Sequence, residues 1–211
     1  MSHVKRFLAA FLLLFAILAG PLPAQERFDA TLFGGLNLCQ IDGDESGRYN
    51  HPGLRAGVGS SMVLGRDAQS PWRLSAELAF SQKGSRIVRE SFTRTIALSY
   101  VELPISLTYS FLEGRLRLSA GVAPAVLVKA RVKDGGGEEN NALAEKFKRF
   151  DWLPVRIGAR YLFTDHLALE AHFQTSMLSI SESTGSGSYR IFHENKGTFN
   201  RIVNFGLAYT F

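Results

Sequence analysis

Short runs in which apolar and polar residues alternate recur along the chain. The last run has apolar side chains at every second position, namely Val203, Phe205, Leu207, Tyr209 and Phe211, with small or polar residues between them. A period of two is that of a β-strand with one apolar face. A closing strand of this kind is typical of transmembrane β-barrels, in which lipid covers the apolar face and neighbouring strands pair the backbone.

Seven earlier runs are predicted as strands, at 28–38, 54–64, 72–80, 100–109, 115–132, 153–161 and 167–174. Their connections alternate in length. Long polar segments lie at 40–52, 82–94, 133–151 and 180–197, and short turns at 65–70, 112–114 and 164–166. The segment 82–94 is either an open loop or an extension of its hairpin above the membrane. In the third long segment Leu143, Phe147 and Phe150, at i, i+4 and i+7, predict a short helix. Pro104 lacks a ladder donor and predicts a local break in pairing. The pattern predicts an all-β, eight-stranded antiparallel transmembrane β-barrel with up-and-down meander topology, and a soluble β-sandwich is the alternative.

Three of the runs end in two aromatic residues separated by one other residue. These pairs are Tyr109 with Phe111, Tyr161 with Phe163, and Tyr209 with Phe211, and Trp72 begins the third predicted strand. In the barrel all seven residues fall at the short-turn, periplasmic end. They are therefore predicted to form an aromatic girdle at that membrane interface.

The first residues have the composition of an export signal. Lys5 and Arg6 precede an apolar stretch over 7–19, and the small residue Ala24 precedes a polar one. The stretch is too short to span a bilayer as a helix. We expect residues 1–24 to be a cleaved signal peptide, residues 25–211 to be one barrel domain, and the protein to reach the cell outer membrane.

Charge and cysteine content narrow the function classes. The chain has 24 Lys and Arg against 19 Asp and Glu, and two of the basic residues lie in the leader. No basic block stands out, so nucleic acid is not an expected partner. Cys39, the single cysteine, excludes an internal disulfide and is expected to pack as a small apolar side chain.

The inward faces of the predicted strands collect charges of both signs. An eight-stranded barrel has just enough interior for side chains, so we expect these charges to satisfy one another in a plugged lumen. Glu77 and Glu102 are each expected to meet an arginine, because an unpaired buried charge is costly. A small conducting or binding pore is the alternative. The predicted lumen network comprises Arg73, Glu77, Glu102, Arg115, Arg117, Arg156, Arg160, Glu170 and His172, with Gln174 beside them.

Catalytic and metal-binding motifs are sparse. His172 with Ser176, or His193 with nearby serines, are the only candidate nucleophile pairs, and His172 is expected to belong to the lumen network. The acidic segment from Asp42 to Ser46 lacks the glutamate that would complete a calcium loop, since Gly53 occupies that position. We expect no enzyme activity, no cofactor and no bound metal.

Several segments resemble the PorT-like outer-membrane β-barrel family common in Bacteroidetes. The matching residues are Gly35 to Asp44 with Gly47-Arg48-Tyr49, Glu77 to Gly84, and Tyr100-Val101-Glu102-Leu103-Pro104, where Cys39 replaces the usual serine. The resemblance covers most of the chain after the leader. It implies an outer-membrane barrel, and one branch of the family serves type IX protein secretion.

These observations favour a structural or interaction protein that meets partners through its extracellular loops. The alternative is an accessory component of a secretion system, and a small pore or barrel enzyme comes third. The expected partners are outer-membrane lipid, the barrel assembly machinery through the C-terminal strand, and envelope or secretion proteins.

Overall fold

The computed structural model describes residues 28–44, 48–65, 69–89, 92–135, 137–182, 188–190 and 193–211, and the expected signal peptide lies outside them. The strands are β1 (Phe28–Asp42), β2 (His51–Val63), β3 (Trp72–Arg89), β4 (Phe92–Glu102), β5 (Ile105–Phe111), β6 (Leu116–Val122), β7 (Ala125–Asp134), β8 (Phe150–Asp151), β9 (Pro154–Leu162), β10 (Leu167–Ser176), β11 (Ser188–Arg190), β12 (His193–Gly197) and β13 (Phe199–Thr210). The helices are η1 (Leu112–Gly114) and α2 (Asn141–Ala144).

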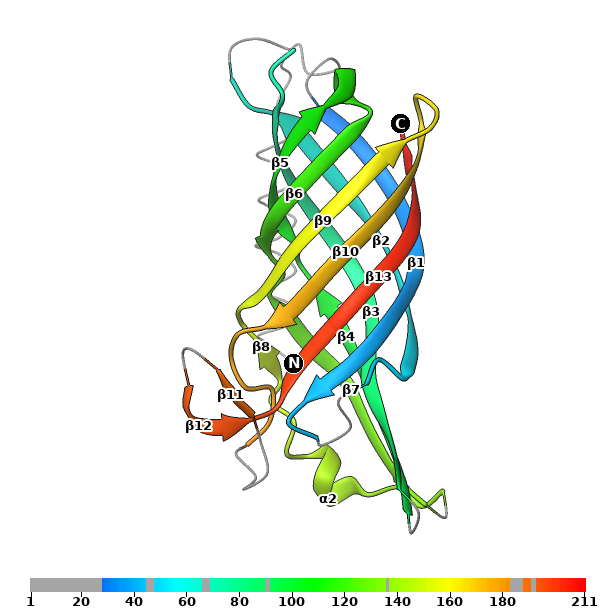
Figure 1. Cartoon of the computed structure of the whole chain (residues 1–211), viewed down its shortest axis with the longest axis vertical. Helices are drawn as coiled ribbons and strands as arrows, with labels where there is room; N and C mark the ends of the chain where they lie inside the picture. The colour runs from blue at the N-terminus through cyan, green and yellow to red at the C-terminus, as the bar shows by residue number, and fades with distance from the viewer. Residues whose placement is uncertain are drawn as a thin grey trace, which may run out of the picture.

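The strands close into an antiparallel ring of eight (Figure 1). Around the ring lie β1, β2, β3, then β4 continued by β5, β6 continued by β7, then β9, β10 and β13. The first and last strands close the ring, with Thr31 opposite Thr210 and Asp42 opposite Phe199. The predicted eight-stranded meander is therefore confirmed.

Two of the eight barrel strands are interrupted at prolines. β4 ends at Glu102 and β5 begins at Ile105, so the predicted break at Pro104 is present. A second break separates β6 from β7 at Pro124, where the sequence predicted one continuous strand. Both prolines lack the N–H that would donate to the ladder.

The alternation along β13 shows why the chain folds this way. Phe205 and Leu207 are 52% exposed, whereas Asn204 and Ala208 point into the barrel and are almost fully buried. The same exposed apolar face continues around the ring. Such a surface is stable in contact with lipid, because apolar side chains need no hydrogen-bond partners there. None of the described helices is long and apolar enough to cross a membrane.

The two ends of the barrel differ in construction. The turns between β2 and β3, β5 and β6, and β9 and β10 lie at one end, at the top of Figure 1. At the other end β3, β4 and β7 extend past the neighbouring strands, and this end also carries α2 and, on the other side of the view, the β11–β12 hairpin. Long loops are extracellular in outer-membrane barrels. We therefore call the first end periplasmic and the second end outer.

Two predicted segments of the outer end take a particular form in the structure. The polar segment 82–94 extends the hairpin above the membrane, the alternative to an open loop, because β3 and β4 continue pairing from Gln82 opposite Ser99 to Arg89 opposite Phe92. Backbone hydrogen bonds extend this hairpin beyond the apolar band, where the side-chain alternation weakens. The predicted short helix is present as α2, but it is shorter than expected: it carries Leu143 and ends at Ala144, before Phe147 and Phe150.

Candidate functional site

The centre of the barrel lumen is held by Arg55, which bridges two carboxylates on different strands. Its guanidinium lies 2.5 Å from Glu77 of β3 and 3.3 Å from Glu170 of β10. Arg55 is 5% exposed and Glu170 is 1% exposed. Charges this deeply buried are stable only in close ion pairs, so this trio joins β2, β3 and β10 across the interior.

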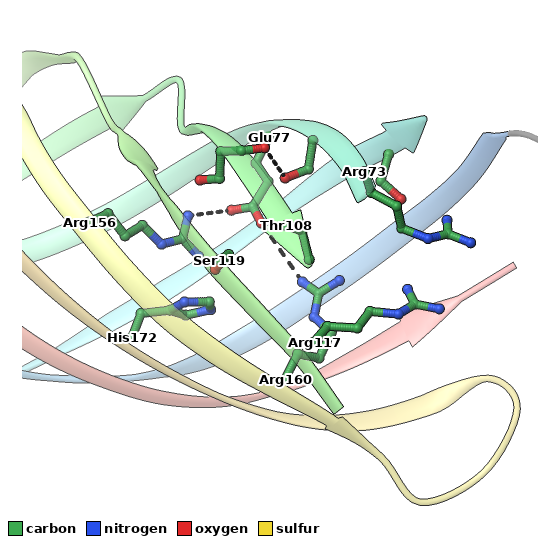
Figure 2. A pocket seen from close by; sticks show the side chains of 11 residues that line it. Arg73, Glu77, Thr108, Arg117, Ser119, Arg156, Arg160 and His172 are labelled. Atoms are coloured by element: carbon green, nitrogen blue, oxygen red, sulfur yellow. Dashed lines mark hydrogen bonds and ion pairs between the residues drawn. The ribbon is translucent and has the colours of Figure 1, made fainter. Parts of the chain in front are cut away.

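Strand β9 supplies two further arginines to the same carboxylates. Arg156 lies 2.7 Å from Glu77 and Arg160 lies 3.7 Å from it (Figure 2). Arg160 also lies 2.8 Å from Glu170. Arg160 and Glu170 are direct partners in the β9–β10 register. Glu77 thus meets arginines, as the sequence predicted. His172 completes the cluster, with Nε2 3.4 Å from Glu170.

The periplasmic part of the lumen contains a second cluster around Asp29. Arg73 lies 2.5 Å from this carboxylate and Arg117 lies 3.6 Å from it. Between the two clusters is a pocket of about 40 Å³. Its walls carry hydroxyl groups and four arginines, and the lining residues are Ser61, Arg73, Ser75, Glu77, Ser106, Thr108, Arg117, Ser119, Arg156, Arg160 and His172.

Towards the outer end, the buried carboxylate Glu102 meets a lysine. Lys83 Nζ lies 2.5 Å from Glu102, and Gln174 donates a hydrogen bond to the same oxygen at 3.0 Å. The prediction that Glu102 contacts an arginine is wrong. Lys83 reaches it because β3 continues past the predicted loop boundary. Gly84 then permits close pairing, since a Cβ there would lie 2.0 Å from the carbonyl oxygen of Ile96.

Above this ion pair an apolar cluster fills much of the lumen, next to the buried polar residues Ser85, Asp151 and Asn200. Tyr100 is fully buried, and the Lys83 ammonium lies 4.7 Å from the centre of its ring. The cluster contains Ile41, Ile96, Leu98, Tyr100, Ala125, Val132 and Ile180, and Leu143, Ala144 and Phe147 of the α2 segment pack against it. A hydrophobic plug therefore closes the outer mouth, where the sequence predicted a polar lumen throughout.

One predicted lumen residue lies elsewhere. Arg115 is exposed at the turn before β6, because that strand begins only at Leu116. Conversely, sequence reasoning missed Asp29, Arg55 and Lys83. Arg55 lies in a weakly patterned run, and Lys83 was assigned to a loop. Phe80 faces outward. Because alternate residues of a strand face opposite sides, the same alternation continued beyond Phe80 would have placed Lys83 on the inward face of β3.

The predicted girdle residues gather at the periplasmic rim. Trp72 and Tyr109 pack edge to face with ring centroids 4.8 Å apart, and the Tyr109 and Phe111 centroids are 4.6 Å apart. Tyr209 and Phe211 form a similar contact at 5.0 Å. Tyr161 and Phe163 are both exposed beside the β9–β10 turn. Exposed aromatic rings in this position suit the interface between lipid and water.

The candidate catalytic and metal-binding residues have other contacts. The Ser176 hydroxyl donates to Asp151 at 2.5 Å, whereas His172 lies beside Glu170. His193 lies in β12, and nothing is described of its side chain. Asp42 forms an ion pair with Arg201 at 2.8 Å, and Asp44 accepts from Ser85. Within the described ranges, no group of three or more His, Cys, Asp or Glu side chains is placed to hold a metal ion.

Comparisons with known proteins agree with this architecture. A profile of the family described as outer membrane protein beta-barrel domain matches residues 23–182. No curated protein matches the sequence. The structure of Ail, the attachment invasion locus protein of Yersinia pestis, in complex with the heparin analogue sucrose octasulfate, has a TM-score of 0.52 at 11% identity, covering 88% of this chain and 99% of Ail.

Two further solved structures are less similar. Neisserial surface protein A gives a TM-score of 0.48 at 13% identity, over 87% of this chain and 97% of that protein. OprG of Pseudomonas aeruginosa gives 0.41 at 10% identity, over 88% and 96%. At these identities the similarity to Ail concerns the barrel fold alone.

Proposed function

The chain belongs to the outer membrane protein β-barrel domain family and lies in the outer membrane, and from this premise we propose that it is a closed barrel acting as a structural and interaction protein through its outer end. The observation that carries the proposal is the filled lumen. Arg55, Glu77 and Glu170 bridge the interior, and the Lys83–Glu102 pair and the apolar plug lie beyond them. A barrel with a filled lumen has no open channel, so its partners contact the loops and strand ends.

Planar-bilayer conductance tests the closed barrel. The refolded protein should give no stepwise conductance, because an ion would have to displace buried charge pairs and then cross the apolar plug. A variant in which Leu98, Tyr100 and Val132 are all changed to glycine removes only the plug and should stay closed as well, because the Arg55 ion pairs still cross the lumen. Regular single-channel steps from the unaltered protein would reject the proposal in favour of a pore.

The outer end carries a basic surface that specifies the partner's chemistry. Lys129, Arg131 and Lys133 alternate along β7, and Arg86 of β3 aligns with Lys133 through Thr95. All four basic side chains are exposed. We call these four residues the basic face.

The carboxylate nearest to this face in sequence is already engaged. Asp134 accepts hydrogen bonds from Arg94 at 2.6 Å and Asn140 at 2.9 Å, and these bonds hold the pKa of Asp134 below its usual range. Glu139 is also exposed opposite Lys133, so the net positive charge of the basic face is centred on Lys129 and Arg131. The basic face therefore suits an anionic surface polymer or acidic protein segment.

A sulfated probe tests this partner class. Ail was solved with a sulfated heparin analogue. We expect the present protein in detergent to bind immobilised heparin, with affinity falling steeply as salt rises. Changing Lys129, Arg131 and Lys133 to glutamine should abolish retention at moderate salt, whereas Arg115→Gln at the opposite end should not. Equal retention of both variants would remove the basic face from the proposal.

The secretion-accessory role is the second candidate, and the PorT-like motifs support it. Three residues of those motifs, Glu77, Lys83 and Glu102, form lumen ion pairs, so the motifs also have a purely structural explanation. A deletion strain separates the two roles. Loss of secreted cargo with an intact envelope would favour the accessory role, and normal secretion would favour the interaction role. We also propose that β13 is the strand read by the barrel assembly machinery, and we assign the protein no catalytic step.

A further inference from the structure

The periplasmic half of the lumen holds more positive than negative charge. Among the residues that the structure describes, five arginines form ion pairs there with three carboxylates. The arginines are Arg55, Arg73, Arg117, Arg156 and Arg160, and the carboxylates are Asp29, Glu77 and Glu170. Positive charge removed from water and left without a full set of counter-charges is unfavourable, so this half of the lumen favours an additional anion.

The excess is concentrated at Arg117. In the β6–β9 register Arg117 lies directly opposite Arg160, and like charges in that position destabilise a sheet. The contacts of the Arg117 guanidinium are long, at 3.6 Å to Asp29 and 3.4 Å to the Gly114 carbonyl. Charge-assisted hydrogen bonds are usually about 2.7–2.9 Å. Arg117 therefore retains donor capacity.

The pocket beside Arg117 has the size and lining of an anion site. Its volume of about 40 Å³ corresponds to roughly three water molecules, which is close to the size of a small oxyanion. Arg73 and Arg160 line it together with Arg117, and Glu77 is its only carboxylate among the lining residues (Figure 2). Hydroxyls of Ser61 and Thr108 complete the wall and can turn to donate, while the Ser119 hydroxyl donates to the Gly158 carbonyl at 3.4 Å.

Access to the pocket is from one side. Arg73 and Arg117 lie one residue inside the starts of β3 and β6 at the periplasmic end, and their side chains keep 17% and 14% exposure. In the other direction the Arg55 ion pairs block the lumen. The pocket is therefore blind and opens towards the periplasm.

We propose that this pocket binds a small oxyanion of the phosphate or sulfate class, held by Arg73, Arg117 and Arg160. The guanidinium fork matches the oxygens of such an anion. The hydroxyl groups of the lining supply neutral donors, and the one carboxylate among the lining residues, Glu77, is already paired with Arg55 and Arg156. The bound anion supplies the counter-charge that the arginines lack, and it does so without opening the barrel.

Calorimetric titration of the detergent-folded protein with sodium phosphate tests the site, with sodium chloride held at matched ionic strength. The protein should bind phosphate saturably. Arg117→Gln should weaken binding at least about tenfold, the effect expected for losing one charge-assisted contact. Arg115→Gln is the matched control, because Arg115 lies two residues earlier and is exposed outside the pocket; it should bind like the unaltered protein.

A second variant separates the pocket from general positive charge. Ser119→Leu fills the cavity and leaves every arginine in place, so it should abolish phosphate binding. Retained folding is checked by the gel shift between boiled and unboiled samples, and Arg73→Gln replaces Arg117→Gln if the latter fails to fold. The proposal is overturned if phosphate gives no more heat than chloride, if Ser119→Leu binds normally, or if Arg115→Gln loses as much affinity as Arg117→Gln.

Glycerol phosphate distinguishes the source of the anion. Because the pocket is blind and opens at one end, a monoester can enter with its phosphate first. Binding equal to that of inorganic phosphate indicates the anionic tip of a larger periplasmic molecule. Binding of inorganic phosphate alone indicates a free ion, and both results support the site.

Discussion

The two halves of the lumen handle buried charge in different ways. In the outer half, Lys83 and Glu102 form a close pair, with side chains 0% and 1% exposed, beneath an apolar plug. In the periplasmic half, arginines outnumber carboxylates around a pocket, and Arg73 and Arg117 remain partly exposed. The outer half has the features of a seal, and the periplasmic half those of a binding site.

The difference shows that a polar lumen is not one kind of environment. Removing a charge from the outer half, where both members of the pair are almost fully buried, leaves the partner without a counter-charge, which costs much free energy. Removing a surplus arginine from the periplasmic half relieves repulsion between like charges. The following substitutions test this contrast in the order of their expected effect on the free energy of unfolding.

The largest loss is expected for Glu102→Ala. It leaves the buried Lys83 ammonium without its ion-pair partner and should lower the free energy of unfolding by about 3–5 kcal/mol. Guanidinium titration of the protein in lipid vesicles measures the loss. The exposed residue Glu138 provides the control, and Glu138→Ala should change stability by less than about 0.5 kcal/mol. Similar losses of stability for both variants would show that water solvates the Lys83 and Glu102 charges in the outer half.

An intermediate loss is expected for Arg156→Gln. Glu77 loses its 2.7 Å partner but keeps Arg55 at 2.5 Å, so the carboxylate is not stranded. The expected loss is about 1.5–3 kcal/mol, the range for hydrogen bonds to charged groups. The temperature at which the folded gel band disappears should fall between those of Glu102→Ala and Glu138→Ala. A loss as large as that of Glu102→Ala would show that Glu77 depends on Arg156 as strongly as Lys83 depends on Glu102.

A smaller loss is expected for Leu143→Ala in α2. Leu143 is half-buried against the plug, so removing most of its side chain should cost about 1 kcal/mol. The change should also increase hydrogen exchange of the α2 amides more than that of the barrel strands. Ala142, exposed on the same helix, gives the control Ala142→Ser. Unchanged exchange in α2 would indicate that Leu143 does not hold the helix on the plug.

The smallest effect is expected for Arg117→Gln in phosphate-free buffer. Because this arginine faces Arg160 and has only long contacts, its loss should change the free energy of unfolding by no more than about 0.5 kcal/mol, in the stabilising direction. The same titration measures the change. A loss of 2 kcal/mol or more, on the scale of a buried charge interaction, would show that Arg117 serves as a structural ion-pair partner.

Much of the architecture follows from the sequence alone. The period of two fixes which side chains face lipid and which face the lumen, because successive residues of a strand point to opposite faces. That rule correctly orients Glu77, Arg156 and Glu170. The alternation of long and short connections fixes the two ends of the barrel, and Pro104 marks a break because it lacks an N–H.

The tertiary structure alone decided which inward charges meet. The alternation predicts whether a side chain points into the lumen but not its position along the barrel axis. The stagger between neighbouring strands decides which inward residues lie at the same level. Arg55 therefore reaches Glu170 across the lumen, and Lys83 rather than an arginine reaches Glu102. Strand ends also depend on pairing rather than on side-chain pattern, which is why β3 continues to Arg89 and Arg115 falls outside β6. Backbone hydrogen bonds extend a hairpin wherever a partner strand is present, whatever its side chains are.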